Sequence, residues 1–460
     1  MTLIKSISGI RGTIGGSPEE NLTPLDAVRF AAAYGTWLLE QNQNKKIKVV
    51  IGRDARLSGS MLQELVQNTL IGLGVDVIDA GLSTTPTIEM AVIFEQAQGG
   101  IILTASHNPK EWNALKLLNA KGEFISASDG ATLLAMVEKE AFQFAEVDAL
   151  GKCHLRNDFI EQHIQAILAL PLVNVAAIQS AGFKVVVDAV NSTGGISIPP
   201  LLKAMGVEMV PLYCEPSGHF PHNPEPLKEH LGDLCRTVST EKADFGIVVD
   251  PDVDRLAFVD EKGQMFGEEY TLVACADYVL SKTVGNTVSN LSSTRALREV
   301  TEKHGGKYTA AAVGEVNVVA AMKAEKAVIG GEGNGGIIYP ELHYGRDALV
   351  GIALFLSHLA DCKQSVSDLR ASYPSFFMSK NKVTLEEGMD VDGILEKIKD
   401  AYIDQNPSTI DGVKIDFEDQ WVHLRKSNTE PIIRIYTEAT SQAAADALAE
   451  TVLNQIRALI

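Results

Sequence analysis

The sequence lacks the features that mark membrane proteins and nucleic-acid-binding proteins. No apolar run reaches the ~18 residues that a membrane span needs, and the opening residues, Met1 to Lys5, do not resemble a signal peptide. Positive charge is scarce, with 40 basic against 59 acidic residues and a formal net charge of −19. A nucleic-acid binder needs a basic face. We therefore expect neither a membrane partner nor a nucleic-acid partner.

Cysteine is sparse as well. The five cysteines, at positions 153, 214, 235, 275 and 362, are odd in number and show no C-x-x-C spacing. This excludes a cysteine-ligated zinc site and fits a reducing compartment, so we expect a cytoplasmic protein. The G-x-S-x-G pattern is also missing, which argues against a serine hydrolase.

What is present is the length and composition of a multidomain globular protein. The chain has 460 residues, of which 45% are hydrophobic and 22% charged. A strand, a polar loop and a helix recur three times, starting from strands 47–51, 184–188 and 287–291. These intervals are far longer than the ~20–50 residues of solenoid repeats. The pattern predicts an α/β fold with three serial α/β domains and mixed, mostly parallel sheets.

The last part of the chain has a different pattern, with several strands between two helices, and predicts a separate α+β domain. We place its start at Tyr373-Pro374 and the first domain boundary in the polar stretch from Val137 to Asp158. Within the second domain, we expect a helix to begin at Pro199-Pro200, because proline favours the first helical turn. The expected domains are 1–152, 153–256, 257–372 and 373–460.

One polar turn follows a buried strand near residue 100. Ile101 to Leu103 run into Thr104-Ala-Ser106-His107-Asn108-Pro109, and Lys116 comes ten residues after Ser106. Ser106 is thus expected at the exit of a strand, where α/β sheets place their chemistry. An ordinary surface turn stays an open alternative on these residues alone. The same holds for the glycine-rich segment from Ser8 to Gly16, whose only charged residue is Arg11.

A second polar loop carries three aspartates at alternate positions. The apolar strand Phe245 to Val249 leads into Asp250-Pro-Asp252-Val-Asp254-Arg255. Carboxylates at this spacing can converge on one hard cation, and all-oxygen ligands suit Mg²⁺. An EF-hand is excluded because arginine stands where that loop needs glycine. A solvated acidic turn is the alternative. Arg255 is placed to hold a phosphate beside the metal.

Two further loops fit the recognition of a phosphorylated sugar. Gly331-Glu332-Gly-Asn334-Gly-Gly336 belongs to a run that formally matches a dinucleotide-binding fingerprint, but the following residues are β-like rather than helical, so we reject that interpretation. A glutamate between glycines is better suited to binding hydroxyls. Near the C-terminus, Arg425 to Pro431 offer a guanidinium, hydroxyls and turn amides, a set suited to a phosphate dianion; a plain hairpin turn is the alternative.

Taken together, these loops resemble those of the α-D-phosphohexomutases, and the resemblance covers the whole chain. It implies four domains around a central cleft, with Ser106 as phosphoserine and phosphoryl carrier. It also implies that Lys116 is the general base. The resemblance further gives Mg²⁺ ligands at Ser106, Asp250, Asp252 and Asp254, and phosphate contacts at Arg425, Ser427, Asn428 and Thr429. Arg11 matches the arginine of the family's N-terminal S-G-I-R-G segment, and Glu332 matches its sugar-binding glutamate.

Three positions depart from the family's usual pattern. Asn334 replaces a serine, Gly336 replaces a histidine that assists proton transfer in some members, and Pro251 replaces a glycine. The changes at Asn334 and Gly336 shift the expected proton transfer toward Lys116 and His107, whereas Pro251 stiffens the acidic loop without removing a ligand. A lysine that acts as a base needs a lowered pKa, and we expect Arg11 and Arg255 to supply it.

The resemblance therefore implies a phosphohexomutase that uses Mg²⁺ and is activated by a hexose 1,6-bisphosphate. It would interconvert the 6-phosphate and 1-phosphate of a small phosphosugar. A phosphoglucosamine mutase is our first expectation, and a phosphoglucomutase/phosphomannomutase of broad specificity is the second. A metal-dependent sugar phosphatase would share the acidic loop and would release phosphate. A non-catalytic sugar-phosphate-binding protein would have no need for Ser106, Lys116 and the aspartates.

Overall fold

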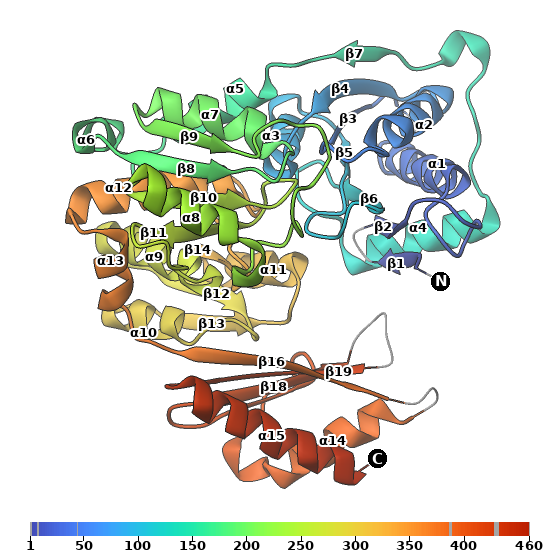
Figure 1. Cartoon of the computed structure of the whole chain (residues 1–460). Coiled ribbons are helices and arrows are strands. Elements are labelled where there is room, and N and C mark those ends of the chain that lie inside the picture. Colours follow the sequence, from blue (N-terminus) through green and yellow to red (C-terminus); the bar gives the residue numbers. More distant parts are fainter. Residues whose placement is uncertain (1, 7–8, 44, 386–388, 427–431, 460) are drawn as a thin grey trace.

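The computed structural model describes residues 2–6, 9–43, 45–385, 389–426 and 432–459. Four sheets follow one another along the chain, each with helices packed against it (Figure 1). None of the described helices combines the length and the apolar character that crossing a membrane requires. The predicted order of three α/β domains and a C-terminal α+β domain is confirmed.

The first sheet has seven strands in the order β1-β2-β6-β5-β3-β4-β7. Strands β5, β3, β4 and β7 are parallel neighbours, whereas the β1-β2-β6-β5 side is antiparallel. Helices α1, α2 and α4 cover one face, and α3 covers the other. The elements are β1 (Ile4–Ser6), β2 (Gly9–Thr13), α1 (Pro24–Gln41), β3 (Lys48–Arg53), α2 (Gly59–Gly72), β4 (Asp76–Leu82), α3 (Thr85–Phe94), β5 (Gly99–Leu103), β6 (Trp112–Leu118), α4 (Ala127–Lys139), a 3₁₀ turn (Val147–Ala149) and β7 (Cys153–Leu155).

The second and third sheets have four strands each, in the orders β11-β10-β8-β9 and β13-β12-β14-β15. In both, one edge strand is antiparallel and the other pairs are parallel. The second domain contains α5 (Phe159–Leu168), α6 (Val175–Ala181), β8 (Lys184–Asp188), α7 (Gly194–Ala204), β9 (Glu208–Leu212), a 3₁₀ turn (Lys228–His230), α8 (Gly232–Glu241), β10 (Phe245–Val249) and β11 (Leu256–Asp260). The third contains α9 (Glu268–Lys282), β12 (Asn286–Asn290), α10 (Ala296–Lys303), β13 (Tyr308–Ala311), α11 (Glu315–Glu325), β14 (Ala327–Glu332), β15 (Gly336–Ile338), α12 (Ala348–Cys362) and α13 (Val366–Ser372).

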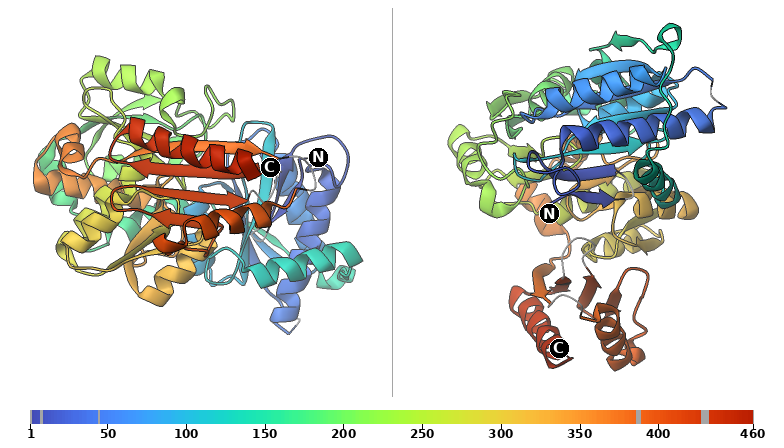
Figure 2. Two further views of the ribbon diagram at one scale, coloured as in Figure 1. Left: turned by 90° about the horizontal axis from the view of Figure 1, so that it is seen from below. Right: turned by 90° about the vertical axis from the view of Figure 1, so that its right-hand side faces the viewer.

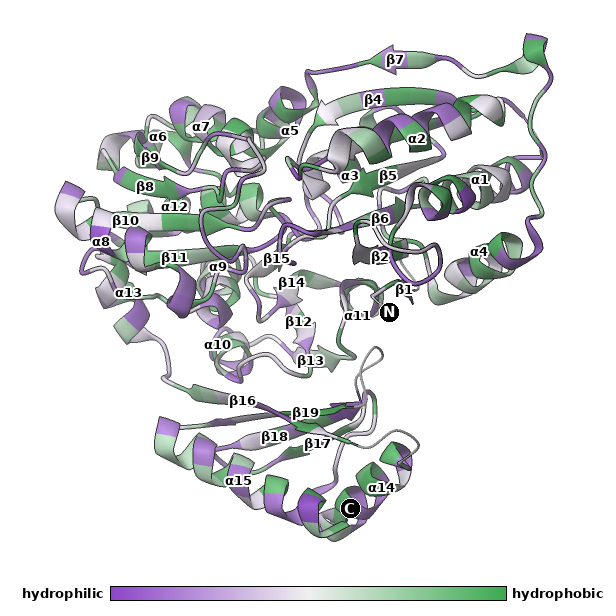
Figure 3. Ribbon diagram, turned by 45° about the vertical axis from the view of Figure 1, so that its right-hand side comes forward, coloured by the Kyte–Doolittle hydropathy of each residue, from purple (hydrophilic) through white to green (hydrophobic). Residues whose placement is uncertain are grey.

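The fourth domain is an antiparallel sheet, β16-β19-β18-β17, with α14 and α15 on one face (Figure 2). It has a hydrophobic core of its own. Figure 3 shows apolar residues along buried strands such as β8, whereas α15 alternates between apolar and polar, as expected for a helix with one exposed face. The elements are β16 (Phe377–Thr384), α14 (Val391–Ala401), a 3₁₀ turn (Ile403–Gln405), β17 (Val413–Asp416), β18 (Trp421–Lys426), β19 (Ile432–Ala439) and α15 (Gln442–Leu459).

Two predicted boundaries move by a strand. Residue 152 falls just before β7, which pairs with β4 and so completes the first sheet. Residue 256 is the first residue of β11, which pairs with β10 and belongs to the second sheet. Strand β7 has only three residues, and its partner β4 is distant in the sequence. Strand β11 follows the polar acidic loop and runs antiparallel to its partner β10. The local pattern therefore did not reveal which sheet they join.

Helix α7 begins earlier than the sequence predicted. It starts at Gly194, and Pro199 and Pro200 lie inside it. The hydroxyl of Thr193 donates to the carbonyl oxygen of Pro251 at 2.8 Å, which anchors the start of the helix against the acidic loop. The tertiary contact, rather than the proline pair, sets the helix start.

The second and third domains share one hydrophobic core. Phe355 from α12 stacks on Phe258 from β11, with ring centroids 3.8 Å apart and an interplanar angle of 14°. Phe245 and Phe266 each pack edge to face against the ring of Phe355. Helix α12 therefore joins the two sheets into one packed body, and the loops at the ends of their strands are held in a fixed relation.

We expect Phe355→Ala to destabilise both domains together, by about 3–5 kcal/mol, because it opens a cavity in the shared core. Hydrogen exchange should show β10 and α9 losing protection to the same extent. Phe377→Ala is the matched control, since that ring is 43% exposed and its removal should cost less than about 0.5 kcal/mol. Loss of protection in only one of the two elements would contradict a shared core.

Candidate active site

Ser106 lies where strand β5 leaves the first sheet, as the sequence predicted. Its backbone is in the left-handed region, with φ at 49°, which costs a non-glycine residue about 1–2 kcal/mol. Its backbone N–H donates to Thr104 Oγ1 at 2.9 Å, and its hydroxyl donates to Asp250 Oδ2 at 2.5 Å. The loop therefore points the Ser106 hydroxyl at the acidic loop of the second domain.

Arg56, which the sequence did not single out as a site residue, holds this loop in shape. Its guanidinium is buried and pairs with Asp54 at 3.0 Å. It donates to four backbone carbonyl oxygens of the Ser106 turn and the segment after it, at 2.5–2.9 Å: those of Ser106, Asn108, Pro109 and Trp112. A planar guanidinium can satisfy several acceptors at once, which a lysine cannot do. Arg56 thus stabilises the backbone of the strained Ser106 turn through these hydrogen bonds.

The three aspartates of the acidic loop come together as predicted. Asp250, Asp252 and Asp254 are fully buried, and one carboxylate oxygen from each lies within 4.8 Å of the others. Burial, together with the charges of Asp252 and Asp254, raises the pKa of Asp250 well above its ordinary value. Asp252 Oδ1 and Asp254 Oδ1 are buried and have no hydrogen-bond partner among the described residues. Orphaned carboxylate oxygens in an all-oxygen cluster fit a hard divalent cation.

Lys116 reaches this cluster from β6. Its ammonium donates to Asp252 Oδ2 at 2.7 Å and to Asp254 Oδ2 at 3.2 Å. Burial alone would lower the pKa of Lys116, but the two carboxylates outweigh burial and raise it. The expectation of a lowered pKa is therefore wrong, because the nearest charges are these carboxylates rather than Arg11 and Arg255.

His107 and Arg255 flank the Ser106 hydroxyl. His107 Nδ1 lies 3.4 Å from Ser106 Oγ, and its Nε2 lies 3.5 Å from a guanidinium nitrogen of Arg255. Burial and the charge of Arg255 hold the pKa of His107 well below its ordinary value, so its imidazole is neutral. Arg11 approaches the same turn and donates to Asn108 Oδ1 at 3.2 Å. The structure thus gathers Arg11, His107 and Arg255 around Ser106.

Arg346 is the second residue that the sequence analysis missed. It lies just before α12 and bridges three carboxylates: Asp254 at 2.7 Å, Glu315 at 2.9 Å and Glu332 at 2.9 Å. The predicted sugar-binding Glu332 also accepts from the side chain of Asn290 at 2.9 Å. Arg346 therefore links the acidic loop to the glycine-rich loop. Its neighbours are contributed by distant segments, so no local pattern marked it.

Gly336 explains how Arg346 reaches the site. A Cβ atom at Gly336 would lie 2.4 Å from Arg346 Cδ and 3.1 Å from Cγ. The arginine stem thus occupies the space that a side chain at position 336 would need. Asn334, on the same loop, uses Oδ1 to accept from the backbone N–H of Gly336 at 3.2 Å, and this bond shapes the turn.

The fourth domain contributes less to the described site. Arg425 forms an ion pair with Asp411 at 3.3 Å. The other predicted phosphate contacts, Ser427, Asn428 and Thr429, lie outside the described residues. The fourth domain contacts the third through several polar bonds, among them Lys414 Nζ to the carbonyl oxygen of Leu291 at 2.8 Å.

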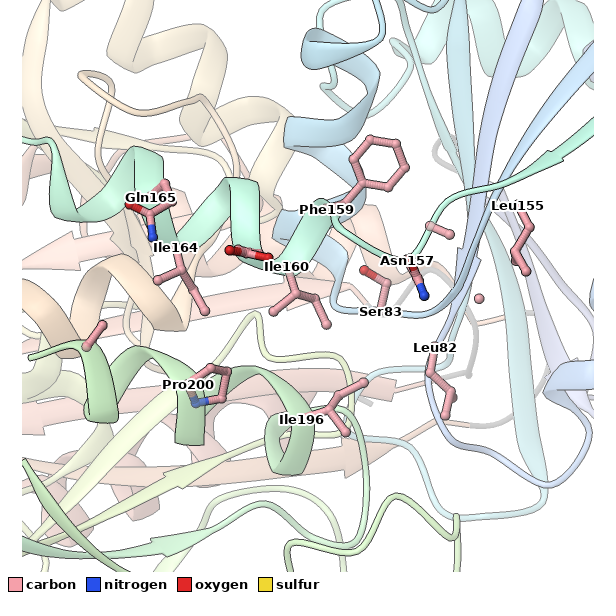
Figure 4. A pocket seen from close by; sticks show the side chains of 14 residues that line it. Leu82, Ser83, Leu155, Asn157, Phe159, Ile160, Ile164, Gln165, Ile196 and Pro200 are labelled. Carbon is pink, nitrogen blue, oxygen red and sulfur yellow. The ribbon is translucent and has the colours of Figure 1, made fainter.

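Two of the hollows that first-domain residues line differ in size and in their lining. A small one, of about 110 Å³, is lined by Arg11, Ser106, Lys116 and their neighbours, and it marks the site described above. A larger one, of about 640 Å³, lies between α5, α7 and the end of β4 (Figure 4). Its lining is mainly apolar, including Ile160, Ile164 and Ile196, and it lacks the charged groups that gather around Ser106.

Comparison with known proteins agrees with this arrangement. The chain matches the four domains described as "Phosphoglucomutase/phosphomannomutase" domain I, II, III and C-terminal domain, over residues 3–144, 161–263, 267–376 and 381–455. A phosphoglucomutase/phosphomannomutase of Thermococcus kodakarensis is 36% identical, over 94% of this chain and 95% of that protein. A probable phosphoglucosamine mutase of Methanopyrus kandleri is 33% identical, over 98% and 97%. The crystal structure of a phosphoglucomutase/phosphomannomutase family protein from Burkholderia thailandensis superposes with a TM-score of 0.84 at 26% identity, covering 99% of this chain and 98% of that one.

We expect Gly336→Ala to displace Arg346 from its three carboxylates. Overpacking of this kind costs about 1–3 kcal/mol, which corresponds to roughly a ten- to hundredfold fall in kcat/KM if the site must keep this geometry. Steady-state kinetics measure the fall. Gly232→Ala is the matched control, because no atom lies within 4 Å of a Cβ placed there. Equal activity of the two variants would show that the position of Arg346 does not matter.

Proposed function

Because the chain belongs to the phosphoglucomutase/phosphomannomutase family, the α-D-phosphohexomutases, we propose that Ser106 is the residue through which it moves a phosphoryl group between the 6- and 1-positions of a hexosamine phosphate. The protein is a phosphohexomutase, an intramolecular phosphotransferase. The observation that carries the assignment of Ser106 is the direct contact of its hydroxyl with Asp250, at the meeting point of the first and second domains.

In this proposal the phosphoryl group is transferred by two successive displacements at phosphorus. The free hydroxyl of the sugar attacks the phosphoryl group on Ser106; the new oxygen–phosphorus bond forms as the bond to Ser106 Oγ breaks, and the electron pair returns to Oγ. The sugar hydroxyl loses its proton to a base. The resulting bisphosphate turns end for end, and Ser106 then takes the phosphoryl group from the other end by the reverse displacement. A hexose 1,6-bisphosphate can start this cycle on the same site, which is why we propose it as an activator.

The acidic cluster holds the cofactor in this proposal. Asp250, Asp252 and Asp254, together with phosphorylated Ser106, form an all-oxygen set suited to Mg²⁺. When bound, the cation would offset the carboxylate charge and stabilise negative charge on the phosphoryl group. Phosphorylation adds about −1.5 to −2 charge to Ser106, so a site with three buried carboxylates requires compensation of this kind.

For the proton, the structure supports His107 more directly than Lys116. The imidazole of His107 is neutral and lies beside Ser106 Oγ, and the negative charge of a phosphoryl group on Ser106 would offset the charge of Arg255 that now weakens it as a base. The ammonium of Lys116 is committed to Asp252 and Asp254. Lys116 becomes a base only where the charge of those carboxylates is offset. We propose His107 as acceptor, with Lys116 as the residue that positions the acidic loop and as the alternative base.

The remaining loops orient the sugar. We propose that Glu332 binds ring hydroxyls with Asn334 on the same turn, and that Arg255 contacts a phosphate beside the acidic loop. The second phosphate of the bisphosphate lies in this proposal against Arg425, Ser427, Asn428 and Thr429. The preference for the amino sugar is supported by the name of the Methanopyrus kandleri relative, whereas the Thermococcus kodakarensis relative supports glucose and mannose phosphates. A cytoplasmic location is supported by the free cysteines.

Ser106→Ala should abolish mutase turnover and prevent phosphorylation of the enzyme by a hexose 1,6-bisphosphate, because Ser106 Oγ is the one hydroxyl that hydrogen-bonds Asp250 in the part of the chain that the structure describes. Coupled assays and mass spectrometry of the intact chain measure the two effects. Ser128→Ala, an exposed serine on α4, should behave as wild type. Full turnover by Ser106→Ala would rule out Ser106 as the carrier.

We expect the highest kcat/KM with glucosamine 6-phosphate among glucosamine 6-, glucose 1- and mannose 1-phosphates, measured with Mg²⁺ and a trace of bisphosphate. Comparable values for the neutral sugars would instead establish the broad-specificity phosphoglucomutase/phosphomannomutase. Phosphate release is followed in the same reactions, because net release in place of isomerisation would indicate a phosphatase.

A further inference from the structure

A second group of potential metal ligands lies outside the acidic loop, and the sequence analysis did not identify it. Within the described part of the chain, His163, His343 and Asp347 place one ligand atom each within 4.8 Å of the others. His163 comes from α5 in the second domain, whereas the other two lie just before α12 in the third domain. All three side chains are buried.

Two of the three separations between the ligand atoms fit a tetrahedral cation site, and all three lie within 4.8 Å. Asp347 Oδ2 lies 3.0 Å from His163 Nε2 and 3.4 Å from His343 Nε2. Ligands at the usual zinc–nitrogen and zinc–oxygen distances of about 2.0–2.2 Å would be roughly 3.3 Å apart in a tetrahedron. The two imidazole rings stand nearly perpendicular, at 81°, with centroids 6.0 Å apart, so both Nε2 atoms face the same carboxylate without stacking.

The second nitrogen of each imidazole lies near an oxygen, but only that of His163 meets hydrogen-bond geometry. His163 Nδ1 lies 3.0 Å from the hydroxyl oxygen of Thr87, and His343 Nδ1 lies 3.3 Å from Glu89 Oε2. Histidines that bind metals usually direct their second nitrogen to a carboxylate or another oxygen in this way. Thr87 and Glu89 both belong to α3 of the first domain. The cluster therefore draws on three domains.

The burial of Glu89 indicates independently that positive charge is needed near this cluster. Its side chain is fully buried, and neither carboxylate oxygen meets hydrogen-bond geometry with a partner among the described residues. A Cβ atom at Gly345 would lie 1.8 Å from Glu89 Oε2, so only glycine lets the third-domain segment pass this carboxylate. Burying such a group is costly unless positive charge compensates it.

We propose that His163 Nε2, His343 Nε2 and Asp347 Oδ2 form a structural site for a divalent transition-metal cation of the zinc type, distinct from the all-oxygen acidic cluster. Two imidazole nitrogens and one carboxylate favour zinc over magnesium. Asp347 supplies the one carboxylate of this ligand set, and Glu89 lies behind His343, at its Nδ1.

Such a cation would fix the segment that carries Arg346. Asp347 Oδ1 accepts from the backbone N–H groups of Leu349 and Val350 at 2.8 Å and 3.3 Å, so this side chain also begins α12. Arg346, the residue before it, extends to Asp254 and Glu332. The cation therefore sits on the reverse side of the segment that supplies a cationic side chain to the active site.

The first experiment uses the full-length wild-type chain, stripped of metal with a chelator and then kept in excess Mg²⁺ so that the acidic cluster is occupied. Titration with Zn²⁺ should show one tightly bound equivalent by elemental analysis and a rise in the unfolding temperature. Co²⁺ in place of Zn²⁺ should give the visible absorption of tetrahedral nitrogen and oxygen ligation. A wild-type chain that takes up no Zn²⁺ under these conditions overturns the proposal, without any variant.

Variants then identify the residues that bind this equivalent of Zn²⁺. Asp347→Asn and His163→Gln should each lose the bound Zn²⁺ and the rise in unfolding temperature. His304→Gln is the matched control, because His304 also pairs with a carboxylate, that of Asp277 at 2.6 Å, but lies outside this cluster. The His304→Gln variant should bind Zn²⁺ as the wild type does. Retention of the equivalent by Asp347→Asn, together with its loss in Asp250→Asn, would assign the ion to the acidic cluster and overturn the proposal.

Discussion

The arrangement of the active site depends on compensating three buried carboxylates. Asp250, Asp252 and Asp254 follow one another at alternate positions on a loop with no access to solvent, where their mutual repulsion is large. The second domain offers only part of the compensation, through the charge of Arg255 and through backbone N–H groups that donate to Asp250 at 3.1 Å. The rest comes from outside: Lys116 from the first domain and Arg346 from the third. Electrostatics at this loop thus brings three domains to one point.

The glycine-rich loop also bears on this cluster, because Gly336 leaves room for the Arg346 side chain that pairs with Asp254. Where the family pattern has a histidine, this chain has Gly336, and the space above that glycine is filled by the stem of Arg346. The cationic group at this place is therefore supplied by a different segment, one that also binds Glu315 and Glu332. A permanently charged guanidinium cannot exchange protons as an imidazole does, so proton transfer falls to other residues. In the mechanism we propose, His107, beside the Ser106 hydroxyl, takes that role.

How much could be predicted from the sequence depends on whether the signal is local. Ser106, the aspartates and Glu332 lie in short runs at strand ends, where residue type and spacing carry the chemistry, and the structure brings Ser106 and the aspartates together. Arg56 was missed because the four backbone carbonyls that it binds lie 50 or more residues away along the chain. Arg346 was missed because its three carboxylates come from separate segments, 14, 31 and 92 residues away, so that no short run of sequence contains them. The pKa of Lys116 was predicted in the wrong direction for a related reason: the relevant neighbours are set by tertiary structure.

The division of the molecule into a rigid part and a separate part follows from its cores. The second and third domains share one hydrophobic core through Phe355, so the acidic and glycine-rich loops keep a fixed relation. The fourth domain has its own core and meets the third mainly through polar bonds. Hydrogen bonds between neutral groups contribute about 0.5–1.5 kcal/mol each and those to charged groups, as at Lys414 and Glu438, about 1.5–3 kcal/mol, because water replaces them when they break. A bisphosphate that must reverse its orientation needs a site that opens at one side while the catalytic loops stay in place, and this distribution of apolar and polar contacts allows the fourth domain to be the side that moves.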